Sequence, residues 1–201
     1  MARLLFTAKD FGSLADPLYP PSTKKLEDLI GMPVQYMQQS HSNNVSVVSK
    51  IGLLQADTDS LISPSKEFAL AVRVADCMPL LLYSKNVVAA VHVGRKGLLN
   101  EVALKTVEKM KTLSSEQITG VVGPHICGDC YEVGEQMATQ IHQTHPATGG
   151  KKNHLNLFAG LKEQLVGIPV ENMNICTMEN QRYFSYRARK DDARQVGVIA
   201  L

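Results

Sequence analysis

The chain has 201 residues, of which 44% are hydrophobic and 20% are charged. That length favours about one domain, and the composition excludes a disordered, collagen-like or coiled-coil protein. With 21 Lys and Arg against 19 Asp and Glu the net charge is only +2, so we expect neither a nucleic-acid partner nor a membrane partner.

The opening residues MARLLFTAKDFG contain an apolar run too short for a secretory signal, and no apolar run is long enough for a transmembrane helix. We therefore expect a cytoplasmic protein whose 4 cysteines act as metal ligands or catalytic groups rather than as disulfides. The loop-like segments 16–22 and 144–153 are too short for linkers, so residues 1–201 are expected to form one domain.

Short apolar runs rich in Val, Leu and Ile predict a series of strands. In chain order they cover residues 4–7, 34–38, 44–48, 68–74, 79–83, 87–93, 118–122, 173–176 and 195–200. Apolar residues at helical spacing predict helices over residues 24–30, from a cap at Asn100 to Met110, over 133–141 and over 157–165. A turn at 84–86 joins two strands as a hairpin, so the pattern indicates an α/β or α+β domain with a mixed sheet.

Three residues at predicted strand ends have side chains that suit a metal. They are His41 in QQSHSNNV, Cys77 in VRVADCMPLLL and His92 in AAVHVGRKG. Zinc accepts imidazole and thiolate ligands, and a site with three protein ligands keeps an open position for catalysis. The spacing alone does not join them, however, because a single strand-end histidine or a single buried cysteine commonly only packs.

Three weaker features could also carry chemistry. The glycine-flanked basic turn around Lys96 precedes a predicted helix and could bind an anion, and Arg187 could hold a phosphate or form an ordinary surface ion pair. Cys127 and Cys130 form a C-x-x-C before another predicted helix, a context that could lower a thiol pKa for redox chemistry or metal binding. No second C-x-x-C completes a zinc ribbon.

The strings ADCMPLLLYS, AAVHVGRKG, GPHICGDCYEVG and RYFSYRARKDDARQVGVIAL resemble the laccase-domain family in order and spacing, from about Leu5 to Leu201. This family, once described as multicopper polyphenol oxidases, comprises zinc-dependent purine nucleoside phosphorylases with adenosine deaminase activity. The resemblance implies two packed mixed sheets flanked by helices, related to cysteine-dependent deamidase toxins. It implies zinc ligands at His41, Cys77 and His92.

The sequence departs from the family beside its second histidine. The common family pattern H-x-G-W-R-G is replaced by His92-Val93-Gly94-Arg95-Lys96-Gly97, and Ser42 stands at a position that is commonly glycine. We expect Lys96 to supply charge for phosphate and Arg95 to point outward or pair with an acidic residue. Arg187 matches the family's arginine in F-S-Y-R.

The resulting hypothesis is an enzyme with one zinc ion that phosphorolyses adenosine, inosine or guanosine and deaminates adenosine. One alternative is a metal-free cysteine hydrolase or deamidase, with Cys77 as nucleophile and His92 as base. A multicopper oxidase is disfavoured because the chain has only 6 histidines, and a non-enzymatic metal-binding protein is the last alternative. The preferred nucleoside and the oligomeric state stay open.

Overall fold

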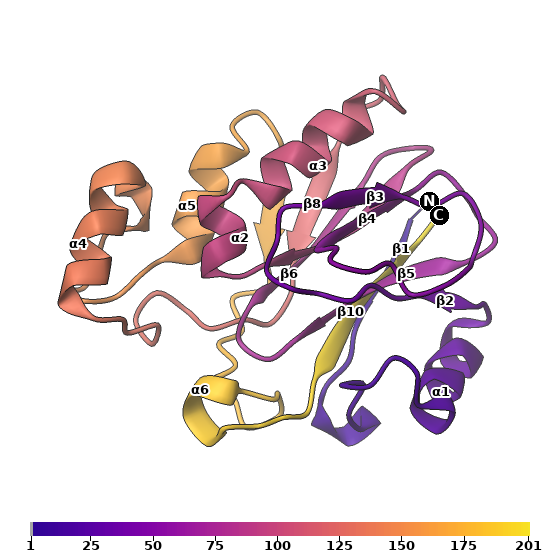
Figure 1. Ribbon diagram of the computed structural model, residues 1–201, viewed down its shortest axis with the longest axis horizontal. Coiled ribbons are helices and arrows are strands. Elements are labelled where there is room, and N and C mark those ends of the chain that lie inside the picture. The colour runs from indigo at the N-terminus through magenta and orange to yellow at the C-terminus, as the bar shows by residue number, and fades with distance from the viewer. Residues whose placement is uncertain (1) are drawn as a thin grey trace.

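The computed structural model describes residues 2–201 as two stacked β-sheets with helices on their outer faces (Figure 1). The strands are β1 Arg3–Phe6, β2 Val34–Gln35, β3 Val45–Val47, β4 Ser60–Ser63, β5 Ala69–Val74, β6 Met78–Tyr83, β7 Val88–Val93, β8 Thr119–Val122, β9 Val170–Asn172 and β10 Gln195–Ala200. The α-helices are α1 Pro20–Ile30, α2 Arg95–Leu99, α3 Val102–Lys111, α4 Glu135–Thr144, α5 Leu157–Gln164 and α6 Tyr186–Arg189.

Both sheets are mixed, as the hairpin predicts. The smaller sheet has the order β1-β10-β5-β2, and only the β2–β5 pair is parallel. The larger sheet has the order β3-β4-β7-β6-β8-β9, with parallel pairs at its two edges and antiparallel pairs between them. The first and last strands pair with each other, so the two ends of the chain lie side by side (Figure 1).

Three apolar layers hold the sheets and helices together. The interior between the sheets is formed by Leu70 and Val72 of β5, Leu81 of β6 and Val88 of β7, among others. The outer face of the large sheet packs against α2, α3 and α5, and the outer face of the small sheet packs against α1. Side chains alternate along each strand, so β6 and β7 supply both the interior and the helix-covered layer.

Most predicted strands are present within a residue or two of their predicted bounds, but two predictions need correction. Residues 173–176 are not a strand: the strand is β9, directly upstream, and the Asn172 side chain ends it by accepting a hydrogen bond from the backbone N–H of Asn174 at 2.8 Å. The sequence pattern also missed β4, because its serines interrupt the apolar run.

The helices differ from prediction mainly at their starts. The helix expected from Asn100 is split into α2 and α3, because Glu101 adopts a left-handed conformation with φ 63°. Helix α1 begins at Pro20, inside the segment expected to be a loop, since proline is well suited to the first helical turn. Gly31 ends α1 with φ 75°, as predicted. Within residues 2–201, no helix has the length and hydropathy that a membrane span requires.

Candidate metal centre and substrate cavity

His41, Cys77 and His92 come together at one end of the two sheets, although 51 positions separate the first from the last (92 − 41 = 51). One donor atom from each residue lies within 4.8 Å of the other two. His41 Nε2 is 3.9 Å from Cys77 Sγ, and the two imidazole rings meet edge to face with centroids 4.7 Å apart. His92 is buried, Cys77 is half-buried and His41 is exposed, so the group is open to ligands on one side.

The register of the large sheet explains this convergence. Met78 of β6 pairs with Val93 of β7, so one further step along both strands sets Cys77 opposite Gly94. Because side chains alternate along β7, His92 faces the interior between the sheets, on the side of Ala90. Only His41 comes from outside this strand pair, on the loop before β3.

A buried carboxylate, Asp59, joins the His41 loop to His92. Its Oδ1 lies 2.6 Å from His92 Nδ1 and accepts the backbone N–H of His41 at 3.1 Å. Its Oδ2 accepts the backbone N–H groups of Ser40 at 3.1 Å and of Ser42 at 2.7 Å. Since Ser60 pairs with Val91, Asp59 stands opposite His92, and its carbonyl accepts the His92 N–H at 2.8 Å. Sequence reasoning missed Asp59, because the strand that places it was itself missed.

The charges of these groups favour a thiolate and an anionic carboxylate. Burial alone would raise the pKa of Cys77, but His92 and His41 beside the thiol lower that pKa to about 6. Burial alone would lower the pKa of His92, but Cys77 and Asp59 raise it to about 9. Burial alone would raise the pKa of Asp59, but the hydrogen bond and charge of His92, together with the backbone N–H groups of Ser40 and Ser42, hold that pKa well below its usual range.

This donor set fits zinc. Two ligands at about 2.0–2.3 Å from a tetrahedral ion lie about 3.3–3.8 Å apart. The His41 Nε2–Cys77 Sγ distance of 3.9 Å is close to this spacing, and all three donor atoms lie within 4.8 Å of one another. Because the Asp59 carboxylate accepts a hydrogen bond, His92 Nδ1 carries the proton and Nε2 is left as the ligand atom. A carboxylate behind a histidine is a common arrangement at zinc sites.

Gly94 leaves the room that the three side chains need. A Cβ atom at this position would lie 2.8 Å from Cys77 Sγ and 3.2 Å from His41 Cδ2. Both contacts are shorter than van der Waals separation, so any side chain would displace the thiol or the imidazole.

A cavity of about 560 Å³ opens beside His41, Cys77 and His92. Its cationic side chains are Arg73, Arg95, Arg187 and Arg194, its acidic side chains are Asp76 and Asp192, and its aromatic rings are Tyr131 and Tyr186. A second hollow shares Arg95, Tyr131 and Arg187 with it. Charge of this kind, together with aromatic faces, suits an anionic ligand that also carries a flat ring.

The four arginines of the cavity are not equally available. Arg73 Nη2 donates to the Met37 carbonyl at 2.9 Å, and Arg194 Nη1 donates to the Asp191 carbonyl at 2.9 Å. In residues 2–201, neither Arg95 nor Arg187 forms an ion pair. The guanidinium carbon of Arg187 lies 5.4 Å from the ring centroid of Tyr131.

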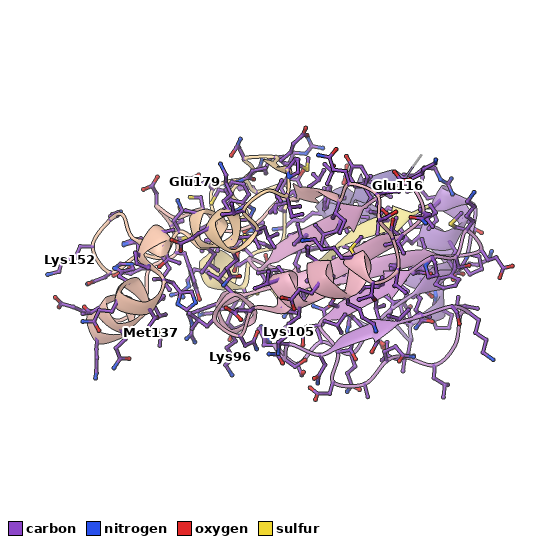
Figure 2. The ribbon with its side chains drawn as sticks, turned by 90° about the horizontal axis from the view of Figure 1, so that it is seen from above. Lys96, Lys105, Glu116, Met137, Lys152 and Glu179 are labelled. Atoms are coloured by element: carbon purple, nitrogen blue, oxygen red, sulfur yellow. The ribbon has the colours of Figure 1, made fainter. Side chains whose placement is uncertain are left out.

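Arg95 and Lys96 do not lie where they were expected from the sequence. Arg95, expected to point outward or pair with an acidic residue, lines both hollows, whereas Lys96 is exposed and lines neither. Figure 2 shows Lys96 on the outside of the molecule. The reason is helical geometry: both residues lie in the first turn of α2, and successive residues of a helix point about 100° apart.

The C-x-x-C context, which could have lowered a thiol pKa, does not do so at Cys127 and Cys130. Burial and the Cys176 thiol raise the pKa of Cys127, and burial and the Cys127 thiol raise that of Cys130. Helix α4 begins only at Glu135, so its N-terminus is too distant to stabilise a thiolate.

Residues 22–201 match the protein family described as multi-copper polyphenol oxidoreductase laccase. A Corynebacterium glutamicum protein named purine nucleoside phosphorylase is 36% identical over 194 residues, covering 88% of this chain and 79% of that protein. A Mycobacterium tuberculosis protein of the same name is 32% identical over 190 residues, covering 87% of this chain and 76% of that protein.

Solved structures share the fold over the whole chain. The Bacillus licheniformis hypothetical protein YfiH has a TM-score of 0.85 at 23% identity, and the match covers 100% of this chain and 92% of that one. A Neisseria meningitidis protein has a TM-score of 0.81 at 27% identity, with coverage of 100% and 94%. The arrangement of two mixed sheets and flanking helices is therefore that of known structures.

Gly94→Ala tests the space around the thiol. We expect loss of zinc binding with a modest loss of stability, because the new methyl group displaces Cys77 Sγ rather than a core side chain. Zinc content by mass spectrometry and thermal unfolding measure the two effects. Gly134→Ala is the matched control, since a Cβ there meets nothing within 4 Å. Equal zinc content in both variants would contradict the conclusion that the thiol and the imidazole need the space left at Gly94.

Asp59→Asn tests the carboxylate behind His92. The two carboxylate oxygens of Asp59 accept hydrogen bonds from His92 and from three backbone N–H groups, whereas an amide has only one acceptor oxygen. We therefore expect zinc affinity to fall about 10- to 100-fold. The free energy of unfolding should fall by about 1–3 kcal/mol. Competition with a chelator and urea denaturation give these values. Unchanged zinc affinity would show that Asp59 does not orient His92.

Proposed function

Because the chain belongs to the laccase-domain family, we propose that it is a zinc-dependent purine nucleoside phosphorylase that also deaminates adenosine. The observation that carries this proposal is that candidate metal ligands and arginines with no ion pair in residues 2–201 lie in the same cavity. The metal-ligand candidates His41, Cys77 and His92 and the arginines Arg95 and Arg187 all line it. Relatives named purine nucleoside phosphorylase support nucleosides and phosphate as the substrates.

In this proposal His41, Cys77 and His92 hold one zinc ion, which supplies Lewis acidity at the cavity when bound. Asp59 keeps the proton on His92 Nδ1 and holds the His41 loop in place through backbone N–H groups. The ligands are thus positioned before substrate arrives, which lowers the cost of reorganisation during the reaction.

Arg95 and Arg187 bind the phosphate. Their planar guanidinium groups can each donate two hydrogen bonds to it, and no carboxylate in residues 2–201 competes by ion pairing. A phosphate oxygen then bonds to C1′ of the ribose as the bond from C1′ to the purine breaks, and the purine leaves with the bonding electron pair and takes up a proton to become the free base. The rings of Tyr131 and Tyr186 offer apolar faces for the base. Deamination uses the same cavity but another atom of the substrate: water adds to C6 of adenosine, the C6–N bond breaks, and ammonia leaves while the bond from C1′ to the purine stays intact.

A cysteine hydrolase is the second candidate, and one observation favours it. His92 lies between Cys77 and Asp59, which is the arrangement of a nucleophile, a base and a carboxylate that orients the base. The relation to cysteine-dependent deamidase toxins, which stays a prediction, would agree with this reading. Zinc analysis separates the two candidates, because a thiol that ligates zinc resists alkylation by iodoacetamide until a chelator is added.

Incubation with nucleosides tests the proposed activity. With phosphate, inosine should give hypoxanthine and ribose 1-phosphate; adenosine without phosphate should give inosine, and chromatography separates the products. Cys77→Ala should abolish both reactions and lower the zinc content, because a methyl group cannot replace a ligand. Activity that persists in Cys77→Ala, or wild-type protein inactive on all purine nucleosides with zinc bound, would overturn the proposal.

Arg187→Met tests the phosphate contact. Removing charged hydrogen bonds of about 1.5–3 kcal/mol should raise the KM for phosphate by about 10- to 100-fold. Deamination of adenosine and zinc content should change little, since neither involves phosphate. Lys96→Met removes a cation outside the cavity and serves as the matched control. If Lys96→Met raised the KM for phosphate more than Arg187→Met, the phosphate site would instead lie at the turn around Lys96.

A further inference from the structure

A second group of sulfur ligands lies outside the proposed active site. One donor atom from each of Cys127, Cys130, Cys176 and Glu179 lies within 4.8 Å of the others. All three of these thiols are free, and none of these four residues lines the cavity beside Cys77. Cys176 is 9% exposed, Cys127 and Cys130 are half-buried, and Glu179 is exposed, so an ion can enter from solvent.

The four side chains come from two turns with the same spacing. Cys127-x-x-Cys130 is closed by the Cys127 carbonyl, which accepts the N–H of Cys130 at 3.2 Å. Cys176-x-x-Glu179 is closed by the Cys176 carbonyl, which accepts the N–H of Asn180 at 2.9 Å. Zinc sites are commonly built from two such pairs of ligands. The sequence alone showed only the first pair, because the second ends in glutamate rather than cysteine.

Backbone contacts hold the two turns face to face. His125 and Cys176 form an isolated parallel bridge, and the N–H of Thr177 donates to the His125 carbonyl at 3.0 Å. The N–H of Cys127 donates to Cys176 Sγ at 3.4 Å. These contacts hold the two turns close together, so that their donor atoms, all within 4.8 Å of one another, can surround one small ion.

We propose that Cys127, Cys130, Cys176 and Glu179 bind a structural zinc ion, distinct from the ion proposed at His41, Cys77 and His92. Three thiolates and one carboxylate complete a tetrahedron, so no position is left for substrate. Thiolates favour zinc over magnesium or calcium, which prefer all-oxygen sites.

This second ion would brace one wall of the substrate cavity. Ile126, next to Cys127, donates its N–H to the Asp76 carbonyl at 2.9 Å. Thr177, next to Cys176, donates its hydroxyl to Asp76 Oδ1 at 2.7 Å. Asp76 precedes Cys77 and has φ 90°, a conformation that L-residues rarely adopt, so these contacts hold a strained residue beside the active-site thiol.

Metal analysis in a Cys77→Ser background tests this site, because that change removes the first one. We expect this variant to retain about one zinc ion per chain after dialysis, and Cys77→Ser combined with Cys130→Ser to retain none. Cobalt in place of zinc should show thiolate-to-metal charge-transfer absorption in the first protein and not in the second. Circular dichroism checks that both chains are folded.

Glu179 permits a test that does not remove a thiol from the site. Glu179→Cys completes a four-cysteine site and should tighten zinc binding by about tenfold or more in the same background. Met178→Cys adds a thiol at the neighbouring position and is the matched control, expected to leave the affinity unchanged. Figure 2 shows Glu179 on the side of the molecule opposite Lys96, so the Glu179→Cys change lies away from the turn around Lys96.

Three results would overturn the second site: no zinc retained by the Cys77→Ser protein, equal effects of Glu179→Cys and Met178→Cys, or a disulfide found by mass spectrometry in freshly purified, zinc-treated protein. Each can occur while the wild-type protein remains an active phosphorylase. Failure of this inference is therefore distinct from failure of the proposed function.

Discussion

The buried carboxylate of Asp59 is the constraint on which the proposed active site depends. Its side chain is fully buried, and a buried charge is tolerated only when it is well paired and hydrogen-bonded. Backbone N–H groups of residues 40–42 and the imidazole of His92 satisfy it from two separate parts of the chain. Because one carboxylate must be satisfied from both segments, the two histidines are held in fixed positions relative to each other. The position of the Cys77 thiol is set separately, by the pairing of β6 with β7.

Strained backbone conformations occur at the candidate metal ligand His41 and directly beside Cys77. His41 has φ 63° and Asp76 has φ 90°, and neither is glycine. Such conformations cost of order 1–3 kcal/mol each and persist where surrounding contacts hold them. The Asp59 carboxylate holds the backbone of His41, while Thr177 and the N–H of Arg187 hold the carboxylate of Asp76. Part of the stability of the fold is therefore used to position the proposed metal ligands and the backbone at Arg187.

The electrostatics of the cavity could not be deduced from the net charge of the chain. A net charge of +2 indicates no strong anionic partner, yet four arginines and only two aspartates line one cavity. Local hydrogen bonds then decide which cations face a ligand. Carbonyl groups hold Arg73 and Arg194, whereas the side chains of Arg95 and Arg187 remain for phosphate in the proposed reaction.

The sequence by itself determined the features that depend on neighbouring residues. Apolar runs located β5 to β7, the turn at 84–86 identified the hairpin, and Gly31 marked the end of α1. The resemblance named His41, Cys77 and His92 as ligands, but spacing could not join them. Only the tertiary structure decided contacts between distant segments: Asp59 against His92, Arg95 rather than Lys96 in the cavity, and Glu179 beside three cysteines. The physical reason is that such contacts follow from strand register and helix rotation, where one residue of shift changes the face on which a side chain lies.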